Sequence, residues 1–407
     1  MKVAIALLTS AALLAPAQDI PLPTPAKREL ERINSHRVTS KGSPAREPGA
    51  EDTPLLSPLV RPDGSTVRTP AEWYQQRRPE LVSAWMSILG KIAPAPEDQQ
   101  WFGDVRQVAE QRRVDKEGYT RIDLDIPLEK DFYQRHLLLL PKGQGNGPFP
   151  AVIAWTSSTP DYQQPEEWWG AYLAQHGYVV LTSWAFIRSY RQGTRGKQAA
   201  ELLYQRFGHW LPIAKMVHDV AREVEYLRTL PQVAPNRIGF MGFSLSAKTA
   251  VYVAAFNPDI QATVSVDPHI AINGGTNWYA PWYLDWGKKL PGMGTVESLL
   301  NPDTKRPGFE HDHHELLALA APRPFLLIGG SQSEDAGGDS DDLQSWGYVN
   351  RAKEVYALLG VPERLLFCST NQGHKATGEQ SDAAWKAFLR YYLQEHPIQI
   401  RPDEQKK

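Results

Sequence analysis

The sequence has little cysteine, little net charge and no long apolar run. Cys368 is the only cysteine among 407 residues, so no intrachain disulfide bond can form. It falls in the apolar stretch 364–368, which predicts a core strand and no chemistry for the thiol. The formal net charge of -2 gives no reason to expect nucleic acid or an anionic membrane as a partner. The length suits one large α/β domain or two modest ones.

The N-terminus has the pattern of a secretory signal peptide over residues 1–17. Met1-Lys2 is a short basic start, and the apolar run over residues 3–14 is too short for a stable membrane anchor. Ala15-Pro-Ala17 supplies the small residues of a cleavage site. We therefore expect a mature chain that begins near Gln18 and is periplasmic or secreted, without a membrane span.

Composition divides the rest of the chain into four parts. Residues 18–69 are rich in Pro, Ser, Gly, Arg and Glu without apolar periodicity, which predicts a Pro-rich flexible arm. Thr69-Pro70 is typical of a helix start, with Thr69 as the N-cap. The expected parts are the arm, a helical extension over 70–98, a main domain over 99–396 and a polar tail over 397–407.

Strands and helices alternate along the main domain. Two strands with alternating polarity, over 119–126 and 132–140, precede a buried strand over 150–155. From about residue 150 onward, short apolar strands follow helices in turn. This alternation predicts an α/β fold with a mostly parallel central sheet and helices on both faces. The active site of such a sheet lies beyond the carboxyl ends of its strands.

One strand-to-helix turn carries a candidate nucleophile. The apolar stretch 237–241 precedes Gly242-Phe-Ser244-Leu-Ser246, and the small-residue stretch 247–255 follows. This context is typical of the nucleophile elbow of α/β-hydrolases, G-x-S-x-G, which pushes the central serine out at the top of the sheet. Ser246 replaces the second glycine. The alternative is an ordinary turn with a helix-capping serine.

A catalytic serine needs a base, which a carboxylate must orient. The α/β-hydrolase chain order is serine, acid, histidine. His374 is the only histidine in the loop after the last expected strand, and we expect it to be the general base.

The acid has several candidates. The acidic loop 331–342 follows the strand after which such hydrolases usually place this residue, and Asp335 is the best placed within it. Glu334 and Asp339 are close behind. Asp267, at the end of the preceding strand, is the alternative acid.

Backbone amides should hold the oxyanion. One is expected from Leu245, directly after the nucleophile. The other is expected from the loop after Trp155, at Thr156 or Ser157, with Thr156 as the choice.

Two clusters contain residue types that bind metal ions, but neither has the ligand spacing of an EF-hand loop or of a zinc helix. Asp335, Asp339 and Asp341 do not follow the ligand order of an EF-hand loop. His311-Asp-His313-His314-Glu315 lacks the i, i+4 histidine pair of a zinc helix, so we expect a structural loop there. No metal and no cofactor are predicted.

Aromatic residues are concentrated in the irregular segment 273–304. Its five aromatic side chains over 278–286 offer faces that suit sugar rings and aryl esters, and Trp278 and Trp282 are expected to bind substrate. The alternative is a lid that packs on its own core.

With these residues in place, the chain resembles secreted bacterial α/β-hydrolases that are acetyl xylan esterase-like or dienelactone hydrolase-like. It also partly resembles the glucuronoyl esterases of carbohydrate esterase family 15. The resemblance spans about residues 70–395. It rests on the stretches 72–77, 147–152, 169–180, 237–242 and 314–324.

The resemblance implies an ester-cleaving serine hydrolase with Ser244 and His374 in its triad. The glucuronoyl esterases carry Gly-x-Ser-Arg-x-Gly-Lys and an acid after the strand that follows the elbow. Lys248 and Asp267 match this plan, so Lys248 is expected to bind substrate. Leu245 stands where their oxyanion-binding arginine would be.

The sequence thus predicts a secreted serine esterase that cleaves carboxylic esters, with acyl esters of a carbohydrate as the favoured substrates. A glucuronoyl esterase or a prolyl-oligopeptidase-type peptidase is the alternative enzyme, although the region before residue 120 is too short for the propeller of such a peptidase. A hydrolase fold kept only for binding is the alternative of another class.

Overall fold

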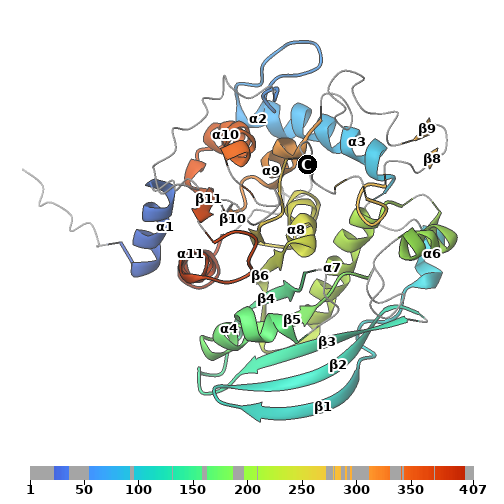
Figure 1. The fold of residues 1–407 in the computed structure, drawn as a ribbon, viewed down its shortest axis with the longest axis vertical. Helices are drawn as coiled ribbons and strands as arrows, with labels where there is room; N and C mark the ends of the chain where they lie inside the picture. The colour runs from blue at the N-terminus through green and yellow to red at the C-terminus, as the bar shows by residue number, and fades with distance from the viewer. Residues whose placement is uncertain are drawn as a thin grey trace, which may run out of the picture.

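A nine-stranded sheet forms the centre of the molecule in the computed structural model (Figure 1). Its strand order is β1-β2-β3-β5-β4-β6-β7-β10-β11. The six strands from β5 to β11 in this order pair in parallel, and β1, β2 and β3 pair antiparallel at one edge. The strands are β1 Ala109–Lys116, β2 Tyr119–Glu129, β3 Phe132–Pro141, β4 Phe149–Trp155, β5 Val179–Ser183, β6 Val233–Phe243, β7 Ala262–Val266, β10 Phe325–Gly330 and β11 Leu365–Thr370.

The structure describes residues 23–35, 55–91, 96–130, 132–157, 163–186, 197–208, 210–271, 278, 280–285, 289–290, 294–295, 311–330, 341, 343–370 and 372–398. The predicted signal peptide and most of the polar tail lie outside these residues. Within this part of the chain, no helix has the length and apolar character needed to cross a membrane.

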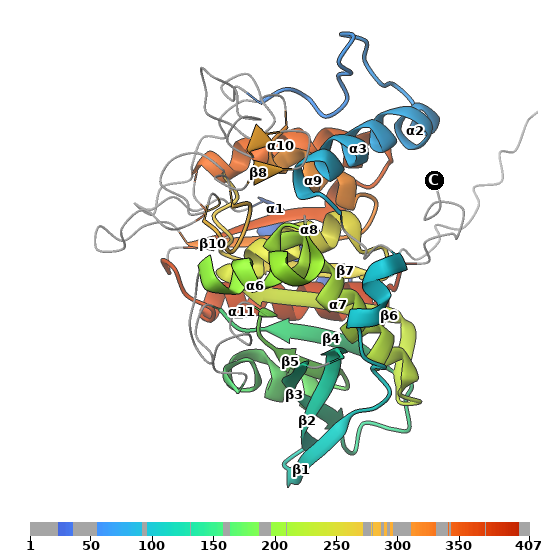
Figure 2. The same cartoon turned by 90° about the vertical axis from the view of Figure 1, so that its right-hand side faces the viewer.

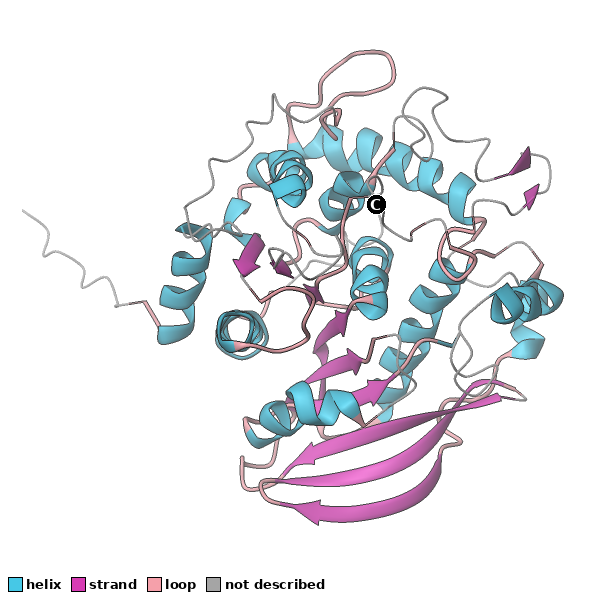
Figure 3. Cartoon of the chain, in the orientation of Figure 1, coloured by secondary structure: helices cyan, strands magenta, loops and turns pink. Residues whose placement is uncertain are grey.

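Both faces of the parallel strands are buried under helices. Along β4, Ile153 packs into one hydrophobic cluster while Val152 and Ala154 pack into the other, and this alternation recurs along β6, β10 and β11. Figures 1 and 3 show the two helical layers, and Figure 2 shows α6, α7 and α8 in front of the strands. The predicted α/β-hydrolase architecture is therefore confirmed.

The helices of the first layer are α3 Arg78–Leu89, α6 Lys197–Phe207, α7 Pro212–Thr229, α8 Leu245–Phe256, α9 His313–Ala320 and α10 Leu343–Leu358. Those of the second layer are α1 Pro25–Ser35, α4 Ala171–Gln175 and α11 Glu379–Leu389. Shorter elements are α2 Pro70–Glu72, the π-helical segments Trp73–Arg77, Glu166–Gly170 and Arg390–Glu395, the 3₁₀ turns Pro96–Trp101 and Pro362–Arg364, and the β8–β9 pair, Lys289–Leu290 with Gly294–Thr295.

The edge strand β1 is absent from the sequence-based prediction. Its residues are exposed almost throughout, so it has none of the apolar alternation that identified β2 and β3. A strand of this kind is fixed by its backbone pairing with β2, which leaves no hydrophobic pattern in the sequence.

The helical run of the extension starts after Thr69, the predicted N-cap, and ends at Gly90. Thr69 and Glu72 form a reciprocal capping box, and Gly90 ends the helical run at a φ of 83°. Trp73 and Trp85 are fully buried against the first helical layer. The extension is therefore part of the core and does not merely cover the domain.

Part of the predicted flexible arm is ordered. Residues 25–35 form α1, whose Ala26, Leu30 and Ile33 are buried against α11 and β11. These three residues follow the i, i+4, i+7 spacing of one helix face, a signal that the surrounding prolines obscured.

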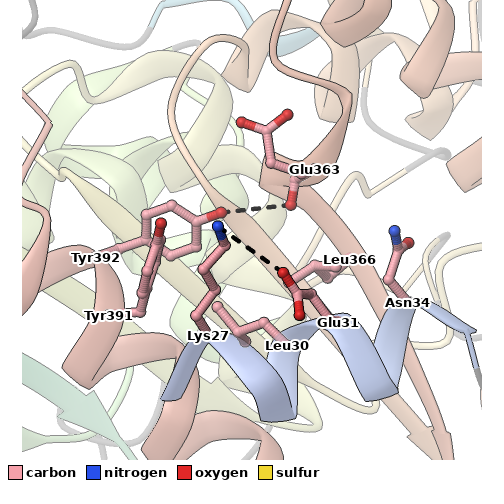
Figure 4. Close-up of a pocket in the computed structure, with 8 residues that line it drawn as sticks. All are labelled: Lys27, Leu30, Glu31, Asn34, Glu363, Leu366, Tyr391 and Tyr392. Atoms are coloured by element: carbon pink, nitrogen blue, oxygen red, sulfur yellow. Dashed lines mark hydrogen bonds and ion pairs between the residues drawn. The ribbon is translucent and has the colours of Figure 1, made fainter. Parts of the chain in front are cut away.

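A pocket of about 190 Å³ lies between α1 and the C-terminal helical segment (Figure 4). Lys27 and Leu30 line it on one side, with Leu366 and Tyr392 on the other. Leu366 is near the first residue of β11, so the pocket is remote from the carboxyl end of that strand.

Cys368, on the same strand, is buried, and burial raises the pKa of its thiol to about 12. The prediction of an unreactive core cysteine agrees with this position.

Candidate active site

Ser244 lies at the sharp turn between β6 and α8. Its backbone has φ 56° and ψ −109°, a conformation that non-glycine residues rarely adopt. Its N–H donates to the Val266 carbonyl at 3.0 Å, which fixes the turn to the end of β7. A Cβ on Gly242 would lie 2.5 Å from the carbonyl group of Ser246, so only glycine fits there. This is the geometry of a nucleophile elbow.

His374 reaches Ser244 from the loop between β11 and α11. Its Nε2 lies 2.9 Å from the Ser244 Oγ, and its ring packs 4.7 Å from the ring of Phe243. The imidazole is about one third exposed and Ser244 is half-buried, so solvent reaches the pair. A Cβ on Gly330, the last residue of β10, would overlap the backbone of Gly373. The close approach of these two segments brings the histidine to the carboxyl ends of the parallel strands.

Asp267 is the carboxylate that His374 contacts. The His374 Nδ1–H donates to Asp267 Oδ2 at 2.6 Å, which leaves Nε2 as the acceptor of the Ser244 hydroxyl proton. Asp267 directly follows β7 and is 2 % exposed. Asp335, the first choice from the sequence, lies outside the described residues, as do Glu334 and Asp339. The structure thus brings the alternative acid to the histidine.

The pKa of Asp267 responds to opposing influences. Burial raises the pKa of this carboxyl above its usual value, and the hydrogen bond from His374 lowers it. The negative charge of Asp341 raises it further, whereas the hydrogen bond from the Asp341 N–H lowers it. The Asp267 carboxylate is therefore isolated from water, and hydrogen bonds from His374 and from the Asp341 N–H stabilise its charged form.

The amides near Ser244 correct one part of the predicted oxyanion hole. Leu245 is the first residue of α8, where backbone N–H groups have no partner within the helix. The Thr156 N–H, however, donates to the Ser183 carbonyl at 3.0 Å and so belongs to the sheet. Thr156 cannot serve an oxyanion in this arrangement, and Ser157 offers the next amide along the loop. The Ser246 hydroxyl donates to the Thr156 carbonyl and ties this loop to the elbow.

The three expected substrate-binding residues are largely inside the protein. Lys248 is 5 % exposed, donates to the Pro268 carbonyl and lies 4.2 Å from the centre of the Trp278 ring. Trp278 is fully buried, and its indole N–H donates to the His269 carbonyl at 2.8 Å. Trp278 therefore supports the turn after β7 and does not form an open wall. Trp282 is half-buried at the edge of the same core.

The histidine cluster at the start of α9 has structural partners. Asp312 caps α9, His313 Nδ1–H donates to the Ile270 carbonyl at 2.6 Å, and Tyr252 donates to His313 Nε2 at 3.0 Å. Burial lowers the pKa of His313 to about 3, so the ring is neutral. Glu315 accepts from Trp85 and contacts His311. These contacts give the cluster structural partners, but His313, His314 and Glu315 form the first turn of α9 and not the predicted loop.

Asp341 is a residue whose role sequence reasoning missed. It comes at the end of the acidic loop, and it is fully buried and hydrogen-bonded to the turn that carries Asp267. One signal was available in Gly329-Gly330 at the end of β10. A Cβ on Gly329 would overlap Asp341, so the glycine marks a close approach of the two segments.

Comparison with known proteins identifies relatives of this fold. The model of the dienelactone hydrolase family matches residues 150–283, a stretch that includes Ser244 and Asp267 and ends before His374. A 4-O-methyl-glucuronoyl methylesterase of Schizophyllum commune (strain H4-8 / FGSC 9210) is 23 % identical over 366 residues, covering 85 % of this chain and 82 % of that protein.

Solved structures of esterases share the fold. A promiscuous esterase of carbohydrate esterase family 15 from a marine bacterial metagenome superposes with a TM-score of 0.61 at 15 % identity, covering 88 % of this chain and 100 % of that one. The glucuronoyl esterase of Solibacter usitatus gives a TM-score of 0.58 at 16 % identity, with 83 % and 97 % covered. The predicted resemblance to dienelactone hydrolase-like and glucuronoyl esterase folds is confirmed, and the curated relative supports the predicted class of carboxylic ester hydrolase.

Proposed function

We propose that this protein is a serine esterase that cleaves a carboxylic ester of a carbohydrate, with Ser244, His374 and Asp267 as its catalytic triad. The observation that carries the proposal is the continuous chain of hydrogen bonds from Ser244 through His374 to a buried carboxylate. All three residues follow the carboxyl ends of parallel strands, where the active sites of such sheets lie.

The geometry suits a two-step acyl transfer. Ser244 Oγ attacks the ester carbonyl carbon while His374 Nε2 takes its proton, and Asp267 stabilises the imidazolium that forms. The Leu245 amide and an amide of the loop after β4 hold the oxyanion. His374 then protonates the departing alcohol. A water molecule, deprotonated by the same nitrogen, releases the acid and restores the serine.

The relatives favour a uronoyl ester as the substrate, because the curated protein at 82 % coverage is named for a 4-O-methyl-glucuronoyl methyl ester. In such a substrate the sugar supplies the acyl group. One residue favours the second candidate, an O-acyl ester in which the sugar is the alcohol. Leu245 is buried and apolar at the position where the resemblance implies an arginine, so no side-chain cation is available there for the oxyanion.

We further propose that the protein is exported. The basic start, the short apolar run and the small residues over 1–17 support removal of a signal peptide, and a polysaccharide ester would be met outside the cytoplasm. N-terminal sequencing of the mature protein should find its first residue near Gln18. An intact Met1 in the exported fraction would contradict this.

The test is hydrolysis of methyl glucuronate, acetylated xylan and p-nitrophenyl acetate by the parent protein and by Ser244→Ala and His374→Ala. Loss of Ser244 should reduce kcat by about 10⁶-fold. Labelling with a fluorophosphonate, followed by peptide mass analysis, should place the label on Ser244. Hydrolysis that survives in Ser244→Ala would refute the triad. A folded parent that neither hydrolyses an ester nor takes the label would indicate a fold kept for binding.

A further inference from the structure

The turn after β7 has an unusual backbone. Asp267 and His269 both have positive φ, at 59° and 55°, although neither is a glycine. Such conformations are unfavourable for residues other than glycine and persist only where surrounding contacts impose them. The turn therefore needs supports from outside its own sequence, and these supports determine where the Asp267 carboxylate points.

Asp341 makes three of the contacts that hold this turn. Its Oδ2 accepts from the His269 N–H and its Oδ1 from the Ile270 N–H, each at 2.7 Å. Its own backbone N–H donates to Asp267 Oδ1 at 2.8 Å. Ser345, in α10, donates to Asp341 Oδ1 at 2.7 Å. One residue thus fixes the backbone after the acid and one oxygen of the acid itself.

The position of Asp341 excludes a solvated role. It is fully buried, and an unpaired buried carboxylate would be strongly unfavourable. Three donors satisfy the carboxylate, so the negative charge is compatible with this burial. The glycine at position 329 allows the backbone at residue 341 to approach this closely.

The contacts also separate Asp341 from the catalytic acid. Both of its oxygens are engaged by the turn and by Ser345, whereas His374 donates to Asp267. The two carboxylates therefore have different roles. Asp267 holds the imidazole, and Asp341 holds Asp267.

We propose that Asp341 is a positioning residue for the catalytic acid, which fixes the strained turn at residues 267–270 so that Asp267 Oδ2 faces His374. This inference rests on the proposed triad. It predicts that loss of Asp341 slows acylation without weakening substrate binding, because Asp341 contacts the turn and not the outer surface.

The experiment compares Asp341→Asn and Asp341→Ala with the parent in steady-state kinetics and in the rate of fluorophosphonate labelling. Misplacement of the acid should lower kcat and the labelling rate by about 100-fold in the alanine variant, and KM should stay within about twofold. The asparagine variant keeps a side-chain acceptor and should lose less. Ser345→Ala retains the carboxylate and should lower kcat by about threefold, the effect of one hydrogen bond.

The pH profile gives a readout that loss of stability alone would not change. Asp267 is faced by His374 and Asp341, while Lys248 of α8 and His313 of α9 contact the carbonyls of the same turn. The negative charge of Asp341 raises the pKa of Asp267, so its removal lets the Asp267 carboxylate stay ionised at lower pH. The acidic limb of kcat/KM should therefore move to lower pH in both Asp341 variants.

The matched control is Asp123→Asn. Asp123 is also a buried aspartate, paired with Arg121 at 2.8 Å on the antiparallel strand β2. Its variant should be less stable but keep the parent's kcat and pH profile. Parent-like kcat and labelling in Asp341→Ala, or a change in KM alone, would overturn the positioning role. Labelling that persists in Ser244→Ala would instead refute the triad and leave this inference without its basis.

Discussion

The elbow at Ser244 and the acid turn at Asp267 place a reactive side chain in the same way but are held in place differently. Each puts a non-glycine residue at positive φ, 56° and 59°. The elbow is held mainly by steric fit between neighbours in sequence, because Gly242 leaves room for the backbone of Ser246, with one hydrogen bond to the end of β7. The acid turn is held mainly by polar contacts from residues outside it, among them Lys248 and Asp341.

The difference concerns how each turn should fail. A turn held by steric fit has no space for another atom, so an added methyl group should lower both the stability and the activity. A turn held by several polar contacts should weaken in steps, one contact at a time.

Among the changes that test this contrast, the largest effect is expected from Gly242→Ala. The added Cβ would lie 2.5 Å from the Ser246 carbonyl, so the elbow must open. The variant should lose about 3 kcal/mol of unfolding free energy. Its kcat/KM should fall by more than about 100-fold through displacement of Ser244. Chemical denaturation and ester hydrolysis measure the two losses.

Gly64→Ala is the control for this substitution. Gly64 also has positive φ, 83°, but a Cβ there has open space around it. It should cost about 1 kcal/mol of stability and leave kcat/KM unchanged. Unchanged activity in Gly242→Ala would show that the elbow can accommodate the added methyl group.

Lys248→Met separates two roles for one residue. In the structure Lys248 donates to the Pro268 carbonyl and packs on Trp278, which supports the acid turn. Loss of this contact, about 1.5 kcal/mol for a hydrogen bond from a charged group, should lower kcat by about tenfold. If Lys248 binds substrate instead, as the resemblance implies, KM should rise while kcat is retained. Separate kcat and KM values on one ester decide between them.

The smallest effect is expected from Ser246→Gly, which restores the glycine of the G-x-S-x-G pattern. The variant loses the hydrogen bond to the Thr156 carbonyl but keeps the steric fit of the elbow. Stability should fall by about 1 kcal/mol. Because the fit holds the nucleophile, kcat/KM should stay within about threefold. A loss as large as that of Gly242→Ala would show that the Ser246 hydroxyl, and not the steric fit, holds the nucleophile in place.

The same contrast explains what could be predicted from the sequence. The elbow, its flanking strand and helix, and His374 were identifiable because local spacing and chain order constrain them. The choice between Asp267 and Asp335 could not be made, since both follow strands that end at the same sheet edge. Contacts from residues remote in the chain direct Asp267 toward His374.

Other differences have the same origin. Trp278 looked like part of an open wall because its aromatic neighbours are close in sequence, but its burial depends on Lys248 and His313. The Thr156 amide was the choice for the oxyanion because it is the first amide after β4, whose predicted end at Trp155 is correct. Pairing with Ser183 extends the strand contacts to that amide.

The most direct test of the proposed triad measures kcat/KM for Asp267→Asn and Asp335→Asn in parallel on one ester. We expect Asp267→Asn to lower kcat by about 10⁴-fold, because the imidazole then takes the wrong tautomer. Asp335→Asn should stay close to the parent. A large loss in Asp335→Asn with little change in Asp267→Asn would contradict the triad and return the acid to the loop after β10.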